Sequence, residues 1–209
     1  MDQRLKRRRQ YEFLFHTARE LRGLDWSGNY DEGYFLTAEV ELSLSRVLCI
    51  FSQGMCAMTG KDAAQALLRM YWDLALPINP VKMATSLGLR VFYSQELNDL
   101  GGYYDQRERA IYVNENDPIT RQRFSIAHEL GHAVLGHGSS PRRNDVVYNK
   151  GNYLQNESAA NRFAATLLMP EVAVRTLVEQ KNMLLNDLCT EFDVSQAAMT
   201  IRLEELGYI

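Results

Sequence analysis

The sequence predicts an α+β fold: a mostly helical domain with a small antiparallel sheet beside one central helix, preceded by an N-terminal extension. Two observations lead to this prediction. Apolar residues recur at intervals of three and four along much of residues 59–209, which is typical of amphipathic helices. Short segments between residues 89 and 113 are typical of strands, and a polar turn joins two of them. We therefore divide the chain into an extension, residues 1–58, and a main domain, residues 59–209.

The composition is that of an ordinary globular protein. The chain has 209 residues, of which 46% are hydrophobic and 23% charged, so it can bury a substantial core. The net charge of −3 gives no overall attraction to nucleic acid. Cys49, Cys56 and Cys189 share no metal-binding spacing and are expected to be reduced thiols. Because neither a signal-peptide core nor a membrane-length apolar run is visible, we expect a cytoplasmic protein.

Residues 1–58 carry the weakest pattern. Residues 11–21 fit an amphipathic helix, and residues 34–51 fit a helix or short strands, with helices slightly preferred. A basic cluster near the start offers weak contact with nucleic-acid phosphates, because each neutralised phosphate releases counterions. A solvated tail is preferred, since a short run of charge without a recognition module is usually just that. The cluster consists of Arg4, Lys6, Arg7, Arg8 and Arg9.

Two helices and three strands are expected before the central helix. Prolines and glycines separate the helices, and the last two strands form a hairpin around residues 106–108. A free edge of this sheet can pair with the backbone of a bound peptide. The expected helices are residues 61–72 and 81–87, and the expected strands are residues 89–93, 101–105 and 109–113.

The central helix is expected to begin after Asp117 and to end at Gly136. The Asp117 side chain can accept a hydrogen bond from a first-turn amide, and Pro118 fits the first helical position, where no amide is needed. Gly136 and Gly138 supply the stop. An apolar stripe for the core is formed by Ile126, Ala127, Leu130, Ala133 and Val134.

Two histidines on this helix indicate a metal site. His128 and His132 are four residues apart, so they lie one above the other on a face roughly opposite the apolar stripe. Their imidazoles can converge on one ion, while the neighbouring Glu129 can take a proton from water held there. The alternative is a helix with ordinary histidines and a surface glutamate. His137, five residues after His132, is expected to rotate away from this face, and His16 is too distant to assign.

A third ligand is required if a fourth position is to stay open for water. Glu157 is the best donor, near the start of a helix capped by Asn156 or Asn152 and stopped by Pro170. Asn161 lies one turn further on the same side, where its amide oxygen can accept the spare ring N–H of a ligand histidine. Alternatively, Glu157 is a first-turn carboxylate favoured by the helix dipole and Asn161 a surface residue.

The motifs A-H-E-L-G-H-A-V-L-G-H and E-S-A-A-N-R-F-A-A-T-L-L-M-P resemble the ImmA/IrrE family of bacterial metallopeptidases, over roughly residues 61–209. The resemblance implies a zincin-like, gluzincin-type domain with Zn²⁺ held by His128, His132 and Glu157. It also implies that Glu129 is the general base and that Asn161 matches the family's asparagine. The expected activity is site-specific cleavage of a helix-turn-helix repressor encoded nearby in a mobile element, prophage or stress locus.

The chain ends in two further expected helices. Residues 184–192 form the first, Asp193 and Val194 the turn, and Ser195 caps the second. The pair looks like a helix-turn-helix, but acidic residues stand where phosphate contact needs lysine or arginine, so packing is preferred over DNA reading.

Two other functions stay open: a zinc-bearing interaction protein without catalysis, and a DNA-binding regulator. We expect a side chain that stabilises the oxyanion, and the sequence does not distinguish among four tyrosines. Separately, Cys49 or Cys56 is a minor candidate for occupying the open zinc position. The tyrosines are Tyr103, Tyr104, Tyr148 and Tyr153.

Overall fold

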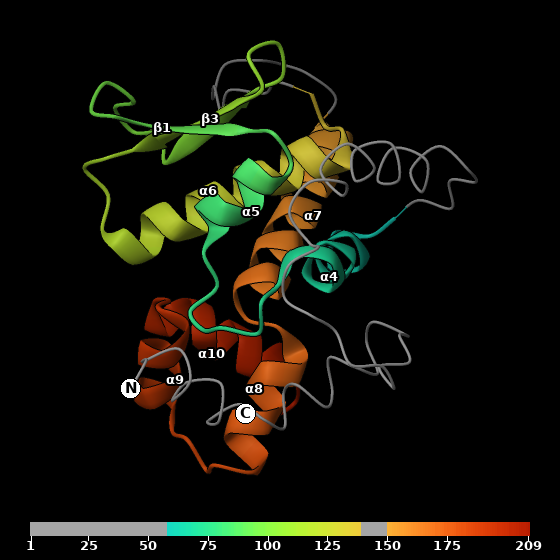
Figure 1. Cartoon of the computed structure of the whole chain (residues 1–209), viewed down its shortest axis with the longest axis vertical. Helices are drawn as coiled ribbons and strands as arrows, with labels where there is room; N and C mark the ends of the chain where they lie inside the picture. Colours follow the sequence, from blue (N-terminus) through green and yellow to red (C-terminus); the bar gives the residue numbers. More distant parts are fainter. Residues whose placement is uncertain (1–57, 139–149) are drawn as a thin grey trace, which may run out of the picture.

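The computed structural model describes residues 58–138 and 150–209 (Figure 1). The N-terminal extension, except for residue 58, lies outside the described residues. So do His16, Cys49, Cys56, Tyr148 and the basic cluster of Arg4, Lys6, Arg7, Arg8 and Arg9.

The described chain forms an α+β domain in which helices predominate, as predicted. The sheet lies at one end, the long helices α6 and α7 cross beside it, and the last three helices gather at the opposite end (Figure 1). In chain order the elements are α4 (Gly60–Tyr71), α5 (Pro80–Ser86), β1 (Arg90–Ser94), β2 (Gly102–Asp105), β3 (Ala110–Asn114), α6 (Ile119–Leu135), α7 (Lys150–Leu168), α8 (Glu171–Glu179), α9 (Leu185–Phe192) and α10 (Gln196–Glu205).

Side-chain caps define the starts of helices α4 and α5. At α4, the Thr59 hydroxyl accepts from the Asp62 amide and the Asp62 carboxylate accepts from the Thr59 amide, at 3.2 and 3.3 Å. At α5, the Asn79 side chain accepts hydrogen bonds from two amides of the first turn, and Pro80 takes the first helical position.

The sheet is mixed rather than wholly antiparallel. Strands β2 and β3 form the expected hairpin, but β1 pairs with β3 in parallel, giving the order β1-β3-β2. The chain crosses from β1 to the far side of the sheet before the hairpin returns it, so β3 runs in the direction of β1. Central β3 is the most buried strand, with Ala110, Ile111 and Val113 at 0% exposure.

Helix α6 begins one residue later than predicted. Asp117 is not its cap: Pro118 holds the cap position with φ −55° and ψ 147°, and no side chain bonds to the first-turn amides. The extended ψ of Pro118 keeps it outside the helix, which moves Asp117 too far from those amides. Gln122 instead donates to the Asp117 backbone carbonyl at 2.7 Å. The predicted end at Gly136 is confirmed, with a left-handed φ of 69°.

The α6–α7 crossing forms the centre of the core. A Cβ atom on Gly131 would lie 3.1 Å from Phe163 Cδ1 and 3.2 Å from Ala160 Cα, so only glycine permits this separation without displacement. Phe163 and Leu130 are fully buried at the crossing. The glycine of the H-E-L-G-H motif therefore sets how closely α7 approaches the histidine face of α6.

Two arginines bind the terminal helices to the rest of the domain. Arg123 of α6 donates to the carbonyls of Ile78, Phe192 and Asp193 at 2.8 to 3.3 Å. Arg202 of α10 donates to the Met169 carbonyl at 3.0 Å. These bonds satisfy carbonyls at chain reversals, where helix and sheet partners are missing.

The α9–α10 pair packs into the common core. Asp193 adopts the left-handed conformation at the turn, and the Ser195 hydroxyl accepts from the Ala198 amide at 3.2 Å, as the sequence predicts. Leu188, Phe192 and Met199 are buried in the same cluster as the residues of α6 and α7. None of the helices in the described ranges has the length and apolar character needed to cross a bilayer.

The crossing makes Gly131→Val a direct test of the fold. The added side chain must displace α7, so we expect the free energy of unfolding to fall by about 1–3 kcal/mol. Ala197→Val, at an exposed position of α10, introduces the same side chain into a helix without a packing clash and should cost less than about 1 kcal/mol. Denaturant unfolding of the metal-free proteins measures both, and equal losses would contradict a packing constraint at residue 131.

Candidate metal centre

Three side chains from α6 and α7 converge on one point. His128 Nε2 lies 3.0 Å from His132 Nε2 and 3.4 Å from Glu157 Oε2, and His132 Nε2 lies 3.3 Å from Glu157 Oε1. Within the described ranges, these residues form a group able to hold a metal ion. The imidazoles are nearly excluded from solvent, at 3% and 6% exposure, whereas the Glu157 side chain is 16% exposed.

The separations fit a tetrahedral ion. Ligand atoms about 2.0–2.1 Å from zinc at tetrahedral corners lie about 3.3–3.4 Å apart. The two imidazole nitrogens are 3.0 Å apart, and each lies 3.3 or 3.4 Å from one of the two Glu157 oxygens, which is close to that value. Two imidazole nitrogens and one carboxylate oxygen also match zinc's usual donor atoms.

The sequence analysis placed Glu157 near the start of its helix, but the structure does not. Helix α7 begins at Lys150, so Glu157 is about two turns inside it and Asn156 is not a cap. Its position follows instead from the helix crossing. Ala160, three residues later, packs on Gly131 and brings the same side of α7 over the two histidines.

The electrostatics favour an ionised carboxylate at position 157. Burial alone would raise the pKa of Glu157, but hydrogen bonding and charge interaction with His128 and His132 outweigh it and hold the pKa well below its usual range. The carboxylate is therefore charged at neutral pH, as metal ligation requires.

Asn161 stands behind one of the histidines. Its Oδ1 lies 2.9 Å from His128 Nδ1, the ring nitrogen that faces away from Glu157. The structure thus places Asn161 where the sequence reasoning required it. A proton on His128 Nδ1 leaves the lone pair of Nε2 directed toward the ligand group.

Glu129 is buried between α6 and the sheet rather than inside the ligand group. It is 6% exposed, and its Cγ lies 3.5 Å from where a Cβ of Gly102 would stand. A Cβ on Gly101 would likewise come within 2.9 Å of Ser125 Oγ. Two adjacent glycines therefore let β2 lie directly on α6 beside Glu129, a close approach that the sequence analysis did not use.

The positions of the tyrosines narrow the choice of a residue that could stabilise the oxyanion. Tyr104 is buried in the core, and Tyr103 stacks on Tyr112 with centroids 4.8 Å apart, on the face of the sheet opposite α6. Tyr153 lies one turn before Glu157 on the same side of α7 and is 42% exposed. Of the three described candidates, Tyr153 is the one that shares a helix face with a ligand residue, Glu157.

His137 is a residue that sequence reasoning misplaced. It does not rotate away from the site, because α6 ends at Leu135 and the chain turns back at Gly136. Its Nδ1 lies 3.0 Å from Nδ1 of His132, and the two rings meet edge to face. Burial, followed by the nearby His132, lowers the pKa of His137.

Comparison with known proteins confirms the family resemblance. A peptidase family model described as the IrrE N-terminal-like domain matches residues 84–204, which include both motifs. An uncharacterised immunity region protein of Bacillus phage phi105 is 30% identical over 122 residues, or 54% of this chain and 70% of that protein. The radiation response metalloprotease IrrE of Deinococcus radiodurans is 35% identical over 83 residues, or 38% of this chain and 25% of that protein.

The structure of a Mycobacterium tuberculosis transcriptional regulator also matches this chain. The matched region spans 79% of this chain and 46% of the regulator. The sequence identity is 15% and the TM-score 0.45, so this likeness does not bear on function.

The ligand geometry predicts that zinc stabilises the protein through Glu157. At a zinc concentration about 100 times the dissociation constant, mass action adds about 2.7 kcal/mol to the stability of the wild type. Glu157→Gln should remove most of this gain, because a neutral amide replaces the ionised carboxylate that metal ligation requires. Thermal unfolding with and without zinc measures the effect, with Glu204→Gln on the exposed side of α10 as control. A Glu157→Gln protein stabilised as much as the control would contradict the assignment.

Proposed function

The chain belongs to the IrrE N-terminal-like family of peptidases, and on this basis and the site geometry we propose that it is a zinc-dependent endopeptidase. The convergence of His128, His132 and Glu157, with Glu129 beside the first histidine, is the observation that carries the proposal. Three protein ligands leave a tetrahedral ion one position for water or substrate, which is the arrangement of catalytic rather than structural zinc.

The protein residues then have distinct tasks. His128, His132 and Glu157 hold the ion, which when bound lowers the pKa of a water and polarises the substrate carbonyl. Glu129 accepts the proton as the water oxygen forms a bond with the carbonyl carbon. It returns that proton to the departing amine nitrogen as the peptide C–N bond breaks, so the products are one carboxyl and one amino terminus.

Strand β2 is suited to orient the substrate backbone. Within the described sheet it pairs only with β3 and lies at an edge, next to α6 at Gly102 and Glu129. A peptide that adds to this edge gains main-chain hydrogen bonds independent of its side chains. Such pairing would hold the scissile carbonyl beside the ligand group in a fixed register.

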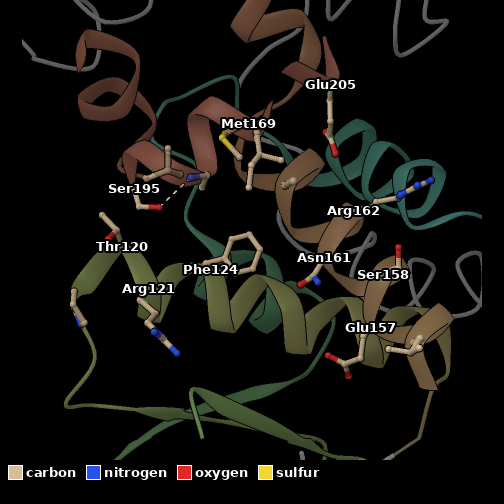
Figure 2. A pocket seen from close by; sticks show the side chains of 16 residues that line it. Thr120, Arg121, Phe124, Glu157, Ser158, Asn161, Arg162, Met169, Ser195 and Glu205 are labelled. Atoms are coloured by element: carbon tan, nitrogen blue, oxygen red, sulfur yellow. Dashed lines mark hydrogen bonds between the residues drawn. The ribbon is translucent and has the colours of Figure 1, made fainter. Parts of the chain in front are cut away.

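A groove on the other side of the ligand group is proposed to select the substrate side chains. It has a volume of about 920 Å³ and runs from Glu157 and Asn161 of α7 to the residues of α10 (Figure 2). Figure 2 shows Phe124 and Met169 around the same hollow. Apolar atoms dominate the lining, which includes Phe124, Leu154, Ala165, Met169, Ala198 and Ile201. We therefore expect apolar substrate residues near the cleaved bond.

The proposed substrate is a helix-turn-helix repressor encoded near this chain in a bacterial or phage genome, and the proposed compartment is the cytoplasm. One relative carries the name of a phage immunity region protein and another that of a radiation response metalloprotease. These names support a regulatory protein as substrate.

Loss of the base should separate catalysis from metal binding. We expect Glu129→Gln to keep its zinc and to cleave the neighbouring repressor about 10²–10⁴-fold more slowly, because the amide cannot accept the proton. Elemental analysis and gel-resolved cleavage measure the two properties, with Glu204→Gln as control. Cleavage by Glu129→Gln at the wild-type rate would contradict the proposed mechanism.

The groove predicts a specific effect at Ile201, which lines it and is 57% exposed. Ile201→Asp should lower kcat/KM for the repressor at least about 10-fold, because an apolar side chain of this size contributes about 1.5–3 kcal/mol when covered. Zinc affinity should be unchanged. Ile119→Asp is the matched control, since Ile119 is 63% exposed and lies outside the groove lining. Equal losses in both variants would count against the groove.

A further inference from the structure

The end of α6 forms a Schellman motif that joins two histidines. The Gly136 amide donates to the Ala133 carbonyl at 3.4 Å, and the His137 amide donates to the His132 carbonyl at 3.1 Å. Gly136 makes the required left-handed turn, with φ 69°. In this motif the residues at the positions of His132 and His137 contact each other, usually through apolar side chains. Here the contact is between two imidazoles, with centroids 5.1 Å apart at an interplanar angle of 71°.

The two nitrogens of His132 face different partners. Its Nε2 lies 3.3 Å from Glu157 Oε1 and 3.0 Å from His128 Nε2, inside the ligand group. Its Nδ1 lies 3.0 Å from His137 Nδ1, outside that group. Metal ligation requires a lone pair on Nε2 of a neutral ring, so the ring proton must be on Nδ1. That N–H then needs an acceptor on the side where His137 stands.

His137 is placed to supply this acceptor, and it is not itself a member of the ligand group of the described chain. A neutral imidazole protonated on Nε2 presents a lone pair at Nδ1, the atom that faces His132. The same nitrogen is directed at His132 Nδ1 and not at the Nε2 atoms, and the ligand group of the described chain is His128, His132 and Glu157. His137 therefore stands behind His132 as Asn161, at 2.9 Å, stands behind His128.

We propose that His137 is a positioning residue for the metal centre: its Nδ1 accepts the His132 Nδ1–H and so fixes the tautomer and ring orientation of that ligand. The proposal rests on the proposed zinc site but not on peptidase activity. Partners of this kind usually change metal affinity about 10- to 100-fold when they are removed.

Two substitutions separate the hydrogen bond from packing. His137→Leu restores the apolar contact usual in the motif and removes the acceptor. His137→Asn places an amide oxygen close to the position of the lost Nδ1 and keeps an acceptor. We expect His137→Leu to weaken zinc binding about 10- to 100-fold and His137→Asn to remain within about threefold of wild type. Asn161→Leu, which removes the acceptor behind His128, should give a loss similar to that of His137→Leu.

Zinc affinity is measured on the full chain by competition with a chromophoric chelator, and far-ultraviolet circular dichroism of the metal-free proteins verifies folding. The absorption spectrum of the cobalt-substituted proteins gives a second readout, which should change in His137→Leu and be restored in His137→Asn. If the leucine variant does not fold, His137→Ala takes its place.

Wild-type affinity in His137→Leu, or an equal loss in His137→Leu and His137→Asn, would overturn the proposal. If the wild type itself binds no zinc, the proposed function fails together with it. Zinc binding by the wild type combined with an unaffected His137→Leu removes only the role of His137.

Discussion

The close crossing of α6 and α7 at Gly131 is the constraint on which the metal centre depends. The Glu157 carboxylate oxygens lie 3.3–3.4 Å from the nitrogens of His128 and His132, although Glu157 belongs to another helix and lies 25 or more positions further along the chain. That separation is possible only if the α7 backbone approaches the histidine face of α6 without an intervening side chain. Gly131 provides this approach between the two histidines themselves, and Ala160 and Phe163 fill the contact from the other side. Helix packing therefore accounts for the convergence of the three ligand residues.

The same helices also supply the groups that hold the ligands in orientation. Asn161 of α7 lies within hydrogen-bond distance of His128, and His137 meets His132 at the turn that ends α6. Each histidine therefore has a partner on Nδ1 while Nε2 faces Glu157. A ring with partners at both nitrogens has little freedom to rotate, so less entropy is lost when the ion binds. Among the described residues, helix packing and the turn that ends α6 organise the centre.

Much of this arrangement could be predicted from the sequence, because it depends on local spacing. Residues four apart on a helix share a face, so His128 and His132 could be paired, and Asn161 could be placed one turn beyond Glu157. The hairpin and the α9–α10 turn followed from their turn residues. The predictions failed where the answer depended on how a segment ends or pairs. The prediction that His137 points away assumed that α6 continues as an ideal helix. In the structure, the left-handed turn at Gly136 reverses the chain. The start of α7 was predicted from capping residues alone, at Asn152 or Asn156, whereas the helix already includes Lys150. The parallel pairing of β1 with β3 was not predicted, because no local sequence feature specifies it.

In the proposed function, substrate selection and metal binding depend on different parts of the domain. The ligands lie on the tightly packed α6–α7 pair, whereas one wall of the proposed groove belongs to α10, which reaches the domain through Arg202 and the Met169 carbonyl. Arg123 ties the preceding turn to α6 only five residues before His128. These bonds fix backbone carbonyls and do not involve the groove-facing side chains of α10, such as Ala198 and Ile201. Changes at those positions can therefore alter which polypeptide fits without moving the histidines. The terminal helix pair, which resembles a helix-turn-helix in outline, is proposed to form a wall of the substrate site rather than to read DNA.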